Sequence, residues 1–510
     1  MKKTIFEIII CVLFVINNIS GAVNIEGTNF NQDLKATTAK HVINGNEGNA
    51  QWSIETVDML GEVGWYTDLA IADSGSVFIS YYNGARENLK LASLKNDRWN
   101  VEVVDSAGDI GMYTSIAVDS FDSPHISYYD HGNGDLKYAK WTGSGWNIEV
   151  VDSDGNVGLD TSIAVDSSGN PHISYYDLDN GDLKYATKRE SEWRLTVVDS
   201  AEDVGHGTSI ALDYYEKPHI SYTDNQRTNL YHACWSESGW SIDIADSECI
   251  IFGSTSIAID MNLYPHICYY DILDHEVWKL KYAFWDGGEW IIETVDPNLR
   301  KFYNEWGVSI VVDQYHRIHI GYYDWETWDL NYALRIGNKW YIETVDSEGV
   351  VGAYAALAVD QEGYPHVSYM DSSNLGLKYA RKTQYSPQPP QMPSGQQYIK
   401  PNKNYNYTTK TSDFDGDQVR YGWDWDGDKI VDEWTGFSSS GETIKTSHSW
   451  DEPGKYDIRV KAQDEQGFLS EWSDPHSLTV PKNKQTYHSL LLTIIKNLIN
   501  SCPLIQHLII

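Results

Sequence analysis

The chain has 510 residues, with 73 Asp and Glu against 38 Lys and Arg, and a formal net charge of −35 at pH 7. Because a nucleic-acid partner is held by Lys and Arg contacts to phosphates, this acidity argues against nucleic-acid binding. The length allows two or three domains, and an aromatic content of 13%, with 20 Trp and 35 Tyr, suits a protein of stacked β-sheets.

The N-terminus has the pattern of a secretory signal peptide. Two lysines precede an apolar run over residues 5–16, and the small residues Ser20 to Ala22 follow. We therefore assign residues 1–22 to a signal peptide and residues 23–51 to a lead segment. The mature protein is expected to be secreted or exposed at the cell surface.

A repeat of 47 to 50 residues fills residues 52–382. Its tryptophans mark the period: Trp52, Trp99, Trp146, Trp193 and Trp240 lie 47 residues apart, and Trp290 and Trp340 follow at intervals of 50. Each copy holds four short segments rich in alternating, β-branched or aromatic residues, separated by turn signals such as Asn-Gly. This period with four strands per copy is typical of a β-propeller, so the fold class predicted is all-β.

The two ends of the repeat predict how the ring closes. The last copy stops at residues 377–382 without an outer strand, whereas the first copy begins with an unpaired outer strand at residues 52–58. If this N-terminal strand completes the last blade, no sheet edge is left open where the ends meet. We therefore predict seven blades.

The repeat resembles the secreted propellers of bacteria and archaea whose blades read SIAVD, PHISYYD and DLKYA. This resemblance implies the fold and export from the cell, and it implies no activity.

Two kinds of polar residue recur in nearly every copy. Histidine is a common metal ligand, but a residue that occurs once per blade lies far from its equivalents, so we interpret it as framework, hydrogen-bonded to an Asp such as Asp119 or Asp130. The recurring Asp is expected to cap turns, with a calcium ring as the alternative. The six His are His125, His172, His219, His266, His319 and His366, and the six Asp are Asp105, Asp152, Asp199, Asp246, Asp296 and Asp346.

Copies five and six depart from the repeat in their loops, where aromatic and acidic residues gather. Aromatic rings can stack on a sugar while carboxylates accept from its hydroxyls, and the same residues suit a protein hot spot. The third interpretation is that the longer loops bury their own aromatics. The candidate ligand-binding residues are Trp278, Phe302, Tyr303, Glu305, Trp306, Trp325, Glu326 and Trp328.

No catalytic motif accompanies these loops. Arginine is scarce and does not recur at a fixed repeat position, no Asp-box is present, and neither GxSxG nor HExxH occurs. We therefore expect a non-catalytic protein. The alternative is a propeller-type carbohydrate-active enzyme, a glycoside hydrolase or lyase.

Beyond a Pro-rich linker at residues 383–398, the sequence no longer follows the repeat. Residues 399–481 resemble the PKD domain, an immunoglobulin-like β-sandwich. The resemblance implies a spacer or adhesion module of a surface or secreted protein. It is carried by Trp423, Asp426, Gly427, His448, Trp450, Pro453, Gly454, Tyr456, Val460, Asp464 and Gly467.

Two acidic loops inside this module predict calcium as a cofactor. Calcium takes six to eight oxygen ligands, and carboxylates that alternate around a Gly turn can supply them. The alternative is that these are ordinary turn residues of the PKD pattern. The candidate ligands are Asp413, Asp415 and Asp417 in the first loop, and Asp424, Asp426, Asp428 and Asp432 in the second.

The C-terminal tail at residues 482–510 is apolar but interrupted by polar residues and Pro503. It suits a sorting segment or a peripheral anchor at the membrane or cell surface better than a membrane span. Taken together, the sequence predicts a monomeric, secreted or cell-surface protein. Its propeller is expected to bind a glycan or a surface protein, with the PKD module as a spacer.

Overall fold

The computed structural model describes residues 52–226, 228–247, 249–272, 277–300, 307–481 and 491–497. The predicted signal peptide and lead segment lie outside these described residues, as does most of the C-terminal tail.

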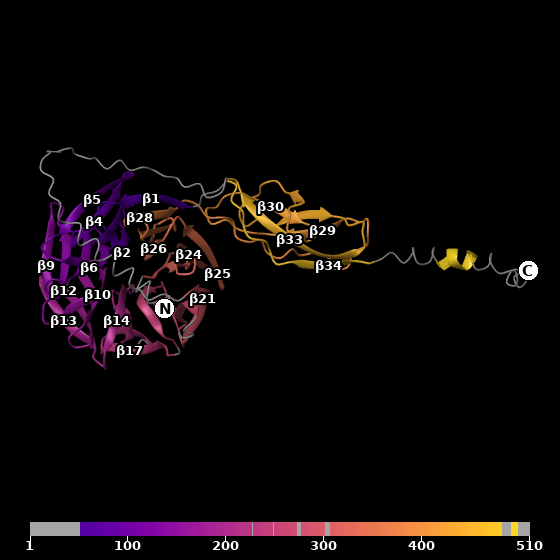
Figure 1. Ribbon diagram of the computed structural model, residues 1–510. Helices are drawn as coiled ribbons and strands as arrows, with labels where there is room; N and C mark the ends of the chain where they lie inside the picture. The colour runs from indigo at the N-terminus through magenta and orange to yellow at the C-terminus, as the bar shows by residue number, and fades with distance from the viewer. Residues whose placement is uncertain are drawn as a thin grey trace, which may run out of the picture. The chain divides into compact units, whose positions relative to one another are not determined.

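Residues 52–382 form seven four-stranded antiparallel sheets, which are arranged as a ring of blades (Figure 1). The first blade contains β2 (Val63–Ile71), β3 (Val77–Asn83), β4 (Asn88–Lys95) and β5 (Arg98–Asp105). The second contains β6 (Ile110–Val118), β7 (Pro124–Asp130), β8 (Asp135–Trp141) and β9 (Trp146–Asp152). The third contains β10 (Val157–Val165), β11 (Pro171–Asp177), β12 (Asp182–Arg189) and β13 (Glu192–Asp199).

The next three blades repeat this order. The fourth contains β14 (Val204–Leu212), β15 (Pro218–Asp224), β16 (Leu230–Ser236) and β17 (Gly239–Asp246). The fifth contains β18 (Ile251–Ile259), β19 (Pro265–Asp271), β20 (Val277–Trp285) and β21 (Trp290–Arg300). The sixth contains β22 (Ser309–Val312), β23 (Ile318–Asp324), β24 (Asp329–Ile336) and β25 (Lys339–Asp346).

The seventh blade joins the two ends of the repeat. It contains β26 (Val351–Val359), β27 (Pro365–Asp371), β28 (Gly376–Lys382) and, as its outer strand, the N-terminal β1 (Trp52–Asp58). The β1–β28 register runs from Trp52 opposite Lys382 to Asp58 opposite Leu377. The predictions of seven blades and of closure by the first strand are therefore confirmed.

Burial follows position in the blade. The second strand β7 is buried along its whole length, because it lies between two strands of its own sheet and between two neighbouring blades. The outer strand β9 is mostly exposed or half-buried and becomes buried at its end. Each inner strand contacts the inner strands of both neighbouring blades, which makes the ring continuous.

The recurring His is part of the framework, as predicted. In the second blade, His125 Nε2 lies 3.1 Å from Asp119 Oδ2, and the Tyr138 hydroxyl lies 2.7 Å from His125 Nδ1. The same His–Tyr contact recurs in the third, fifth, sixth and seventh blades. In the fourth blade His232 takes the place of the Tyr, and its Nε2 lies 3.0 Å from His219 Nδ1.

The recurring Asp of the outer strand also holds the framework. Asp105 Oδ2 accepts from the Tyr128 hydroxyl at 2.8 Å and from Lys137 Nζ at 2.6 Å, while Asp105 Oδ1 accepts from the Ala107 N–H at 3.1 Å. It thus joins its own turn to the next blade. These contacts support the framework interpretation over a calcium ring.

The C-terminal module is a β-sandwich. Strand β29 (Tyr405–Thr409) pairs with β32 (Ile444–His448), and the second sheet has the order β31 (Glu433–Trp434), β30 (Val419–Asp424), β33 (Gly454–Asp464), β34 (His476–Val480). Trp423, Trp425 and Trp450 fill its core. Residues 394 and 398, which the sequence analysis places in the linker, form β-bridges to this sandwich at Thr408 and Thr479. The module therefore begins earlier than predicted.

The described part of the tail, residues 491–497, is a short helix with exposed Leu491, Leu492, Ile494 and Ile495. Within the described residues, no helix is long and apolar enough to span a membrane.

The buried His residues predict loss of stability in acid. Burial lowers the pKa of His232 from 6.5 to about 3. The folded state therefore resists a proton that the unfolded state accepts, so stability is lost as the pH falls below 6.5 toward 3. At pH 4.5 this amounts to about 3 kcal/mol for one residue. His232→Tyr, which restores the residue found in other blades, should reduce the loss of unfolding free energy between pH 7.5 and 4.5. Denaturant titrations at the two pH values measure it, and an unchanged loss would contradict the prediction.

Candidate functional site

A cavity of about 220 Å³ lies on the axis of the ring. All seven blades line it with successive residues at or next to the inner strand. The lining residues are Tyr66 to Asp68, Tyr113 to Ser115, Asp160 to Ser162, Gly207 to Ser209, Gly253 to Ser256, Gly307 to Ser309 and Tyr354 to Ala356. We call this cavity the channel mouth.

The backbone at the rim of the channel mouth has an unusual conformation. Tyr66, Tyr113, Asp160 and Tyr354 have φ values of 51°, 51°, 50° and 56°, in the left-handed region. The register of the inner strand shifts at this point in six of the seven blades, as between Trp65 and Asp68 in the first blade. A side chain in this region costs on the order of 1–3 kcal/mol, and such strain gathers at functional sites. The repeated bulge therefore marks the rim as a candidate site.

The rim is asymmetric. Tyrosines from three successive blades gather on one side, with ring centroids of Tyr66 and Tyr113 4.7 Å apart and those of Tyr66 and Tyr354 5.0 Å apart. The next blade places Asp160 at this position, and the remaining three place Gly207, Ser254 and Gly307 there. The channel mouth thus has an aromatic side and a side of small residues.

Close approach of the backbone explains the glycine of the fourth blade. Gly207 has a φ of 57°, and a Cβ there would lie 2.8 Å from the Gly253 carbonyl oxygen and from Ser254 Cα. A larger residue would push the neighbouring backbone away. Blade packing therefore keeps the residue at this position of the fourth blade small.

Two layers of hydroxyl groups lie below the rim and join the blades. In the first layer, the Thr114 hydroxyl donates to Ser80 Oγ of the preceding blade at 3.0 Å, and four other blades repeat this Thr–Ser contact. In the second, a Ser hydroxyl accepts from an amide of the next blade, as in Ile163 N–H to Ser115 Oγ at 3.2 Å. Four further blade junctions repeat it.

Asp68 occupies the place of this Ser in the first blade. Its Oδ2 accepts from the Ile116 N–H and from the Ser115 hydroxyl, both at 2.8 Å, and its Oδ1 accepts from the Leu69 N–H at 2.8 Å. Burial raises the pKa of Asp68 even though these three hydrogen bonds lower it. Asp160 Oδ2 accepts from the Gly207 N–H at 2.8 Å. Two carboxylates therefore stand at the channel mouth, each held by a neighbouring blade.

A further set of aromatic residues surrounds the rim on several blades. The hydroxyls of Tyr82, Tyr129 and Tyr176 each donate a hydrogen bond of 2.6 Å. Their acceptors are Asp109, Asn156 and Asp203, respectively. The His206 ring lies 4.1 Å from the Tyr176 ring. These hydrogen bonds fix the orientation of the rings around the channel mouth.

The aromatic loops predicted for ligand binding have a different environment. Trp278 and Trp325 are 1% and 3% exposed, lie 6.0 Å apart, and belong to the hydrophobic core between the fifth and sixth blades. Trp328 packs against that core half-buried, and Glu326 is exposed. Phe302, Tyr303, Glu305 and Trp306 lie outside the described residues.

The burial of Trp278 and Trp325 supports the interpretation in which the longer loops bury their own aromatics. Part of the loop expected before the inner strand of the sixth blade belongs to a strand instead. Strand β21 continues to Arg300, which is paired with Val277 of β20. The extra length of the fifth copy therefore builds a longer hairpin.

The sequence analysis missed the channel mouth, although a signal was present. The residue before the inner-strand motif varies from copy to copy as Tyr, Tyr, Asp, Gly, Ser, Gly and Tyr, while the four residues after it read Thr-Ser-Ile-Ala in four of the seven copies. A varying residue beside a recurring motif is what a site on a repeated framework requires.

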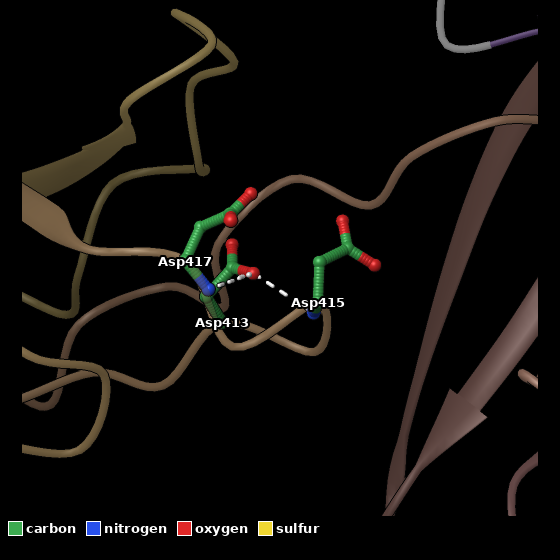
Figure 2. A group of neighbouring side chains, drawn as sticks. All are labelled: Asp413, Asp415 and Asp417. Atoms are coloured by element: carbon green, nitrogen blue, oxygen red, sulfur yellow. Dashed lines mark hydrogen bonds between the residues drawn. The ribbon is translucent and has the colours of Figure 1, made fainter.

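The structure brings the predicted calcium ligands together in two separate clusters. Asp413, Asp415 and Asp417 offer carboxylate oxygens within 4.8 Å of one another (Figure 2). Asp424, Asp426 and Asp432 do the same, without Asp428.

Comparison with known proteins identifies the C-terminal module. Residues 391–474 match the PKD domain family, so the sandwich is a PKD domain. It is similar to the PKD domain of an M14-like peptidase from Thermoplasmatales archaeon SCGC AB-540-F20, with 36% identity over 20% of this chain and 100% of that chain, and a TM-score of 0.18. A PKD domain joined to a propeller fits a surface or extracellular protein.

Two further structures are similar over other shares of the chain. A fucose lectin from Kordia zhangzhouensis in complex with methyl-fucoside has 20% identity over 26% of this chain and 96% of that chain, with a TM-score of 0.21. A bifunctional GH43-CE protein of Bacteroides eggerthii has 10% identity over 82% of this chain and 58% of that chain, with a TM-score of 0.31. No curated protein matches the chain.

Replacement of Asp68 tests how the channel mouth is held. Asp68→Ser restores the residue of the other blades and should keep the bond from the Ile116 N–H. Because the folded-state pKa of Asp68 is raised, its charge opposes folding once the pH exceeds the unfolded value of 3.8. The variant should gain on the order of 1 kcal/mol in unfolding free energy at pH 7.5, and less as the pH falls toward 4. A loss at pH 7.5 in denaturant titration would refute it.

Trp325→Ala tests the burial of the aromatic loops. Removing a buried Trp should lower the unfolding free energy by about 3–5 kcal/mol. Tyr214, which is 84% exposed, provides the control, and Tyr214→Ala should change stability by less than about 0.5 kcal/mol. Similar small effects for both variants would mean that Trp325 is not part of the core.

Proposed function

We propose that this propeller protein with a PKD domain is a non-catalytic extracellular or cell-surface binding protein, and that its ligand is a terminal sugar residue of a glycan held at the channel mouth. The observation that carries the proposal is the asymmetry of the rim. Three tyrosine rings and a carboxylate face a side of small residues above two layers of hydroxyl groups.

The chemistry of the channel mouth suits a sugar. The C–H face of a pyranose stacks on aromatic rings, while its hydroxyls donate to carboxylates and exchange hydrogen bonds with Ser and Thr. Pockets for drug-sized ligands measure about 300–1,000 Å³, so a cavity of about 220 Å³ suits a smaller ligand. A single sugar residue at the end of a chain fits this limit.

The channel mouth is also preorganised. The Thr–Ser and Ser–amide bonds hold the inner strands together, and hydrogen bonds orient the surrounding tyrosines. Little conformational freedom is then lost on binding, which favours affinity.

The contacts of the two carboxylates favour binding over hydrolysis. A glycosidase uses one carboxyl as an acid and a second as a base or nucleophile, so both must reach the scissile bond. Here both oxygens of Asp68 accept hydrogen bonds from protein groups, and Asp160 accepts from the Gly207 backbone. These hydrogen bonds hold both carboxylates in place, which suits fixed acceptors for a ligand better than groups that exchange a proton.

The PKD domain suits the same function as a spacer. Its core residues Trp423, Trp425 and Trp450 stabilise a compact sandwich. A spacer of this kind would hold the propeller away from a surface.

A glycan array probed with the full chain tests the proposal. Tyr113→Ala removes a ring of the aromatic side, and Asp160→Asn removes a charge at the rim. Each should weaken binding to the sugar selected on the array by about 10-fold or more, since one important contact contributes on the order of 1–2 kcal/mol. Tyr214→Ala removes an exposed tyrosine that does not line the channel mouth and should leave binding unchanged.

Three outcomes would reject the proposal. They are the absence of binding to any glycan, an equal loss of binding in Tyr214→Ala, and release of free sugar from the selected glycan by the wild-type chain. The last would identify a hydrolase, and binding to a surface protein alone would identify the partner considered above as the alternative.

A further inference from the structure

The first acidic loop of the PKD domain contains a buried carboxylate that lacks part of its hydrogen bonding. Asp413 lies between β29 and β30 and is 6% exposed. Its Oδ1 accepts from the Asp415 N–H at 2.9 Å and from the Asp417 N–H at 3.4 Å. Its buried Oδ2 has no hydrogen-bond partner among the described residues. An unpaired buried charge of this kind costs several kcal/mol unless a cation compensates it.

The neighbours of Asp413 add negative charge. The carboxylates of Asp415 and Asp417 come within 4.8 Å of it, and Figure 2 shows the unbonded oxygen of Asp413 turned toward the Asp417 carboxylate. Burial, and after it the charge of Asp415, raise the pKa of Asp413 to about 7. Like charges therefore converge on one point of the loop.

The surrounding groups offset this charge only weakly. Asp415 accepts from the Tyr364 hydroxyl and from the Tyr385 N–H, both at 2.8 Å, and Asp417 accepts from the Gln384 amide at 3.1 Å. All of these donors are neutral. The charge of Lys382 acts on Asp415, but Lys382 forms its own ion pair with Glu343.

The charge of Asp417 also acts on a second buried carboxylate. Asp464 is 1% exposed, and its Oδ2 has no hydrogen-bond partner in the described part of the chain. Burial raises the pKa of Asp464, and the charge of Asp417 raises it as well. A cation at the first loop would relieve this repulsion.

We propose that Asp413, Asp415 and Asp417 bind one calcium ion. Calcium is a hard cation that accepts six to eight oxygen ligands, from carboxylates, backbone carbonyls and water. The three carboxylates would supply ligands from one short turn, and the ion would pair the Asp413 oxygen that has no donor.

The second acidic loop is a matched comparison, because its carboxylates cap turns. Asp424 is fully buried, and its two oxygens accept from the Gly427 N–H at 2.6 Å and from the Lys429 N–H at 3.0 Å. Asp432 accepts from the Trp425 N–H at 2.7 Å, and Asp426 from the Asp428 N–H at 3.1 Å. With its buried carboxylate satisfied in this way, the second loop carries no calcium proposal.

Calcium titration of the full chain tests the proposal. After treatment with EDTA, the wild-type chain should bind one Ca²⁺ in isothermal titration calorimetry, and CaCl₂ should raise its melting temperature more than MgCl₂ does. Asp413→Asn and Asp417→Asn should each weaken calcium binding by at least about 10-fold, which is the loss caused by removing even an outer partner of a metal ligand. Asp426→Asn, in the second loop, should bind as the wild type does.

Other results would overturn the inference. These are a wild-type chain with neither binding heat nor a shift in melting temperature, a loss in Asp426→Asn equal to that in Asp413→Asn, or unchanged binding in Asp417→Asn. If Asp413→Asn does not fold, the wild-type titration and the Asp417→Asn variant decide the question.

Discussion

The pairing of β1 with β28 is the constraint on which the propeller depends. Six blades are continuous in sequence, but the seventh exists only because residues 52–58 return to it as its outer strand. Lys382 strengthens this junction, since it is buried, forms an ion pair with Glu343 and lies 5.3 Å from the Trp52 ring centroid. A ring closed in this way requires each blade to match its neighbours in width and angle, and so the same residues recur in every copy.

This requirement explains why the most repeated polar residues have framework roles. The His of the second strand binds an Asp and a Tyr of its own blade, and the Asp of the outer strand binds a Tyr and a Lys of the next one. Their side chains are buried and hydrogen-bonded, so they are not available to a ligand. Specific binding needs positions at which the copies differ, and the residue at the inner-strand bulge is such a position.

The fold was predictable from the sequence, and the site was only partly so. The tryptophan period and the unmatched strands at the two ends indicated seven blades and their closure, because the repeat records the geometry of the ring directly. The channel mouth could not be seen in the same way. Tyr66, Tyr113 and Tyr354 are about 47 to 288 residues apart in the chain, and only the left-handed bulge brings their rings together.

The aromatic loops and the acidic loops show that the sequence also fails to reveal contacts within a single loop or between neighbouring blades. Trp278 and Trp325 stand in similar polar sequence, yet packing between neighbouring blades buries both. Asp413 and Asp424 each begin a run of alternating acidic residues, so composition alone does not indicate which of the two loops binds calcium. The difference lies in the backbone: the amides of Gly427 and Lys429 reach both oxygens of Asp424, whereas those of Asp415 and Asp417 reach the same oxygen of Asp413. The conformation of the turn decides which carboxylate oxygens receive a backbone N–H. This conformation, rather than the sequence, therefore distinguishes a capped turn from a cation site.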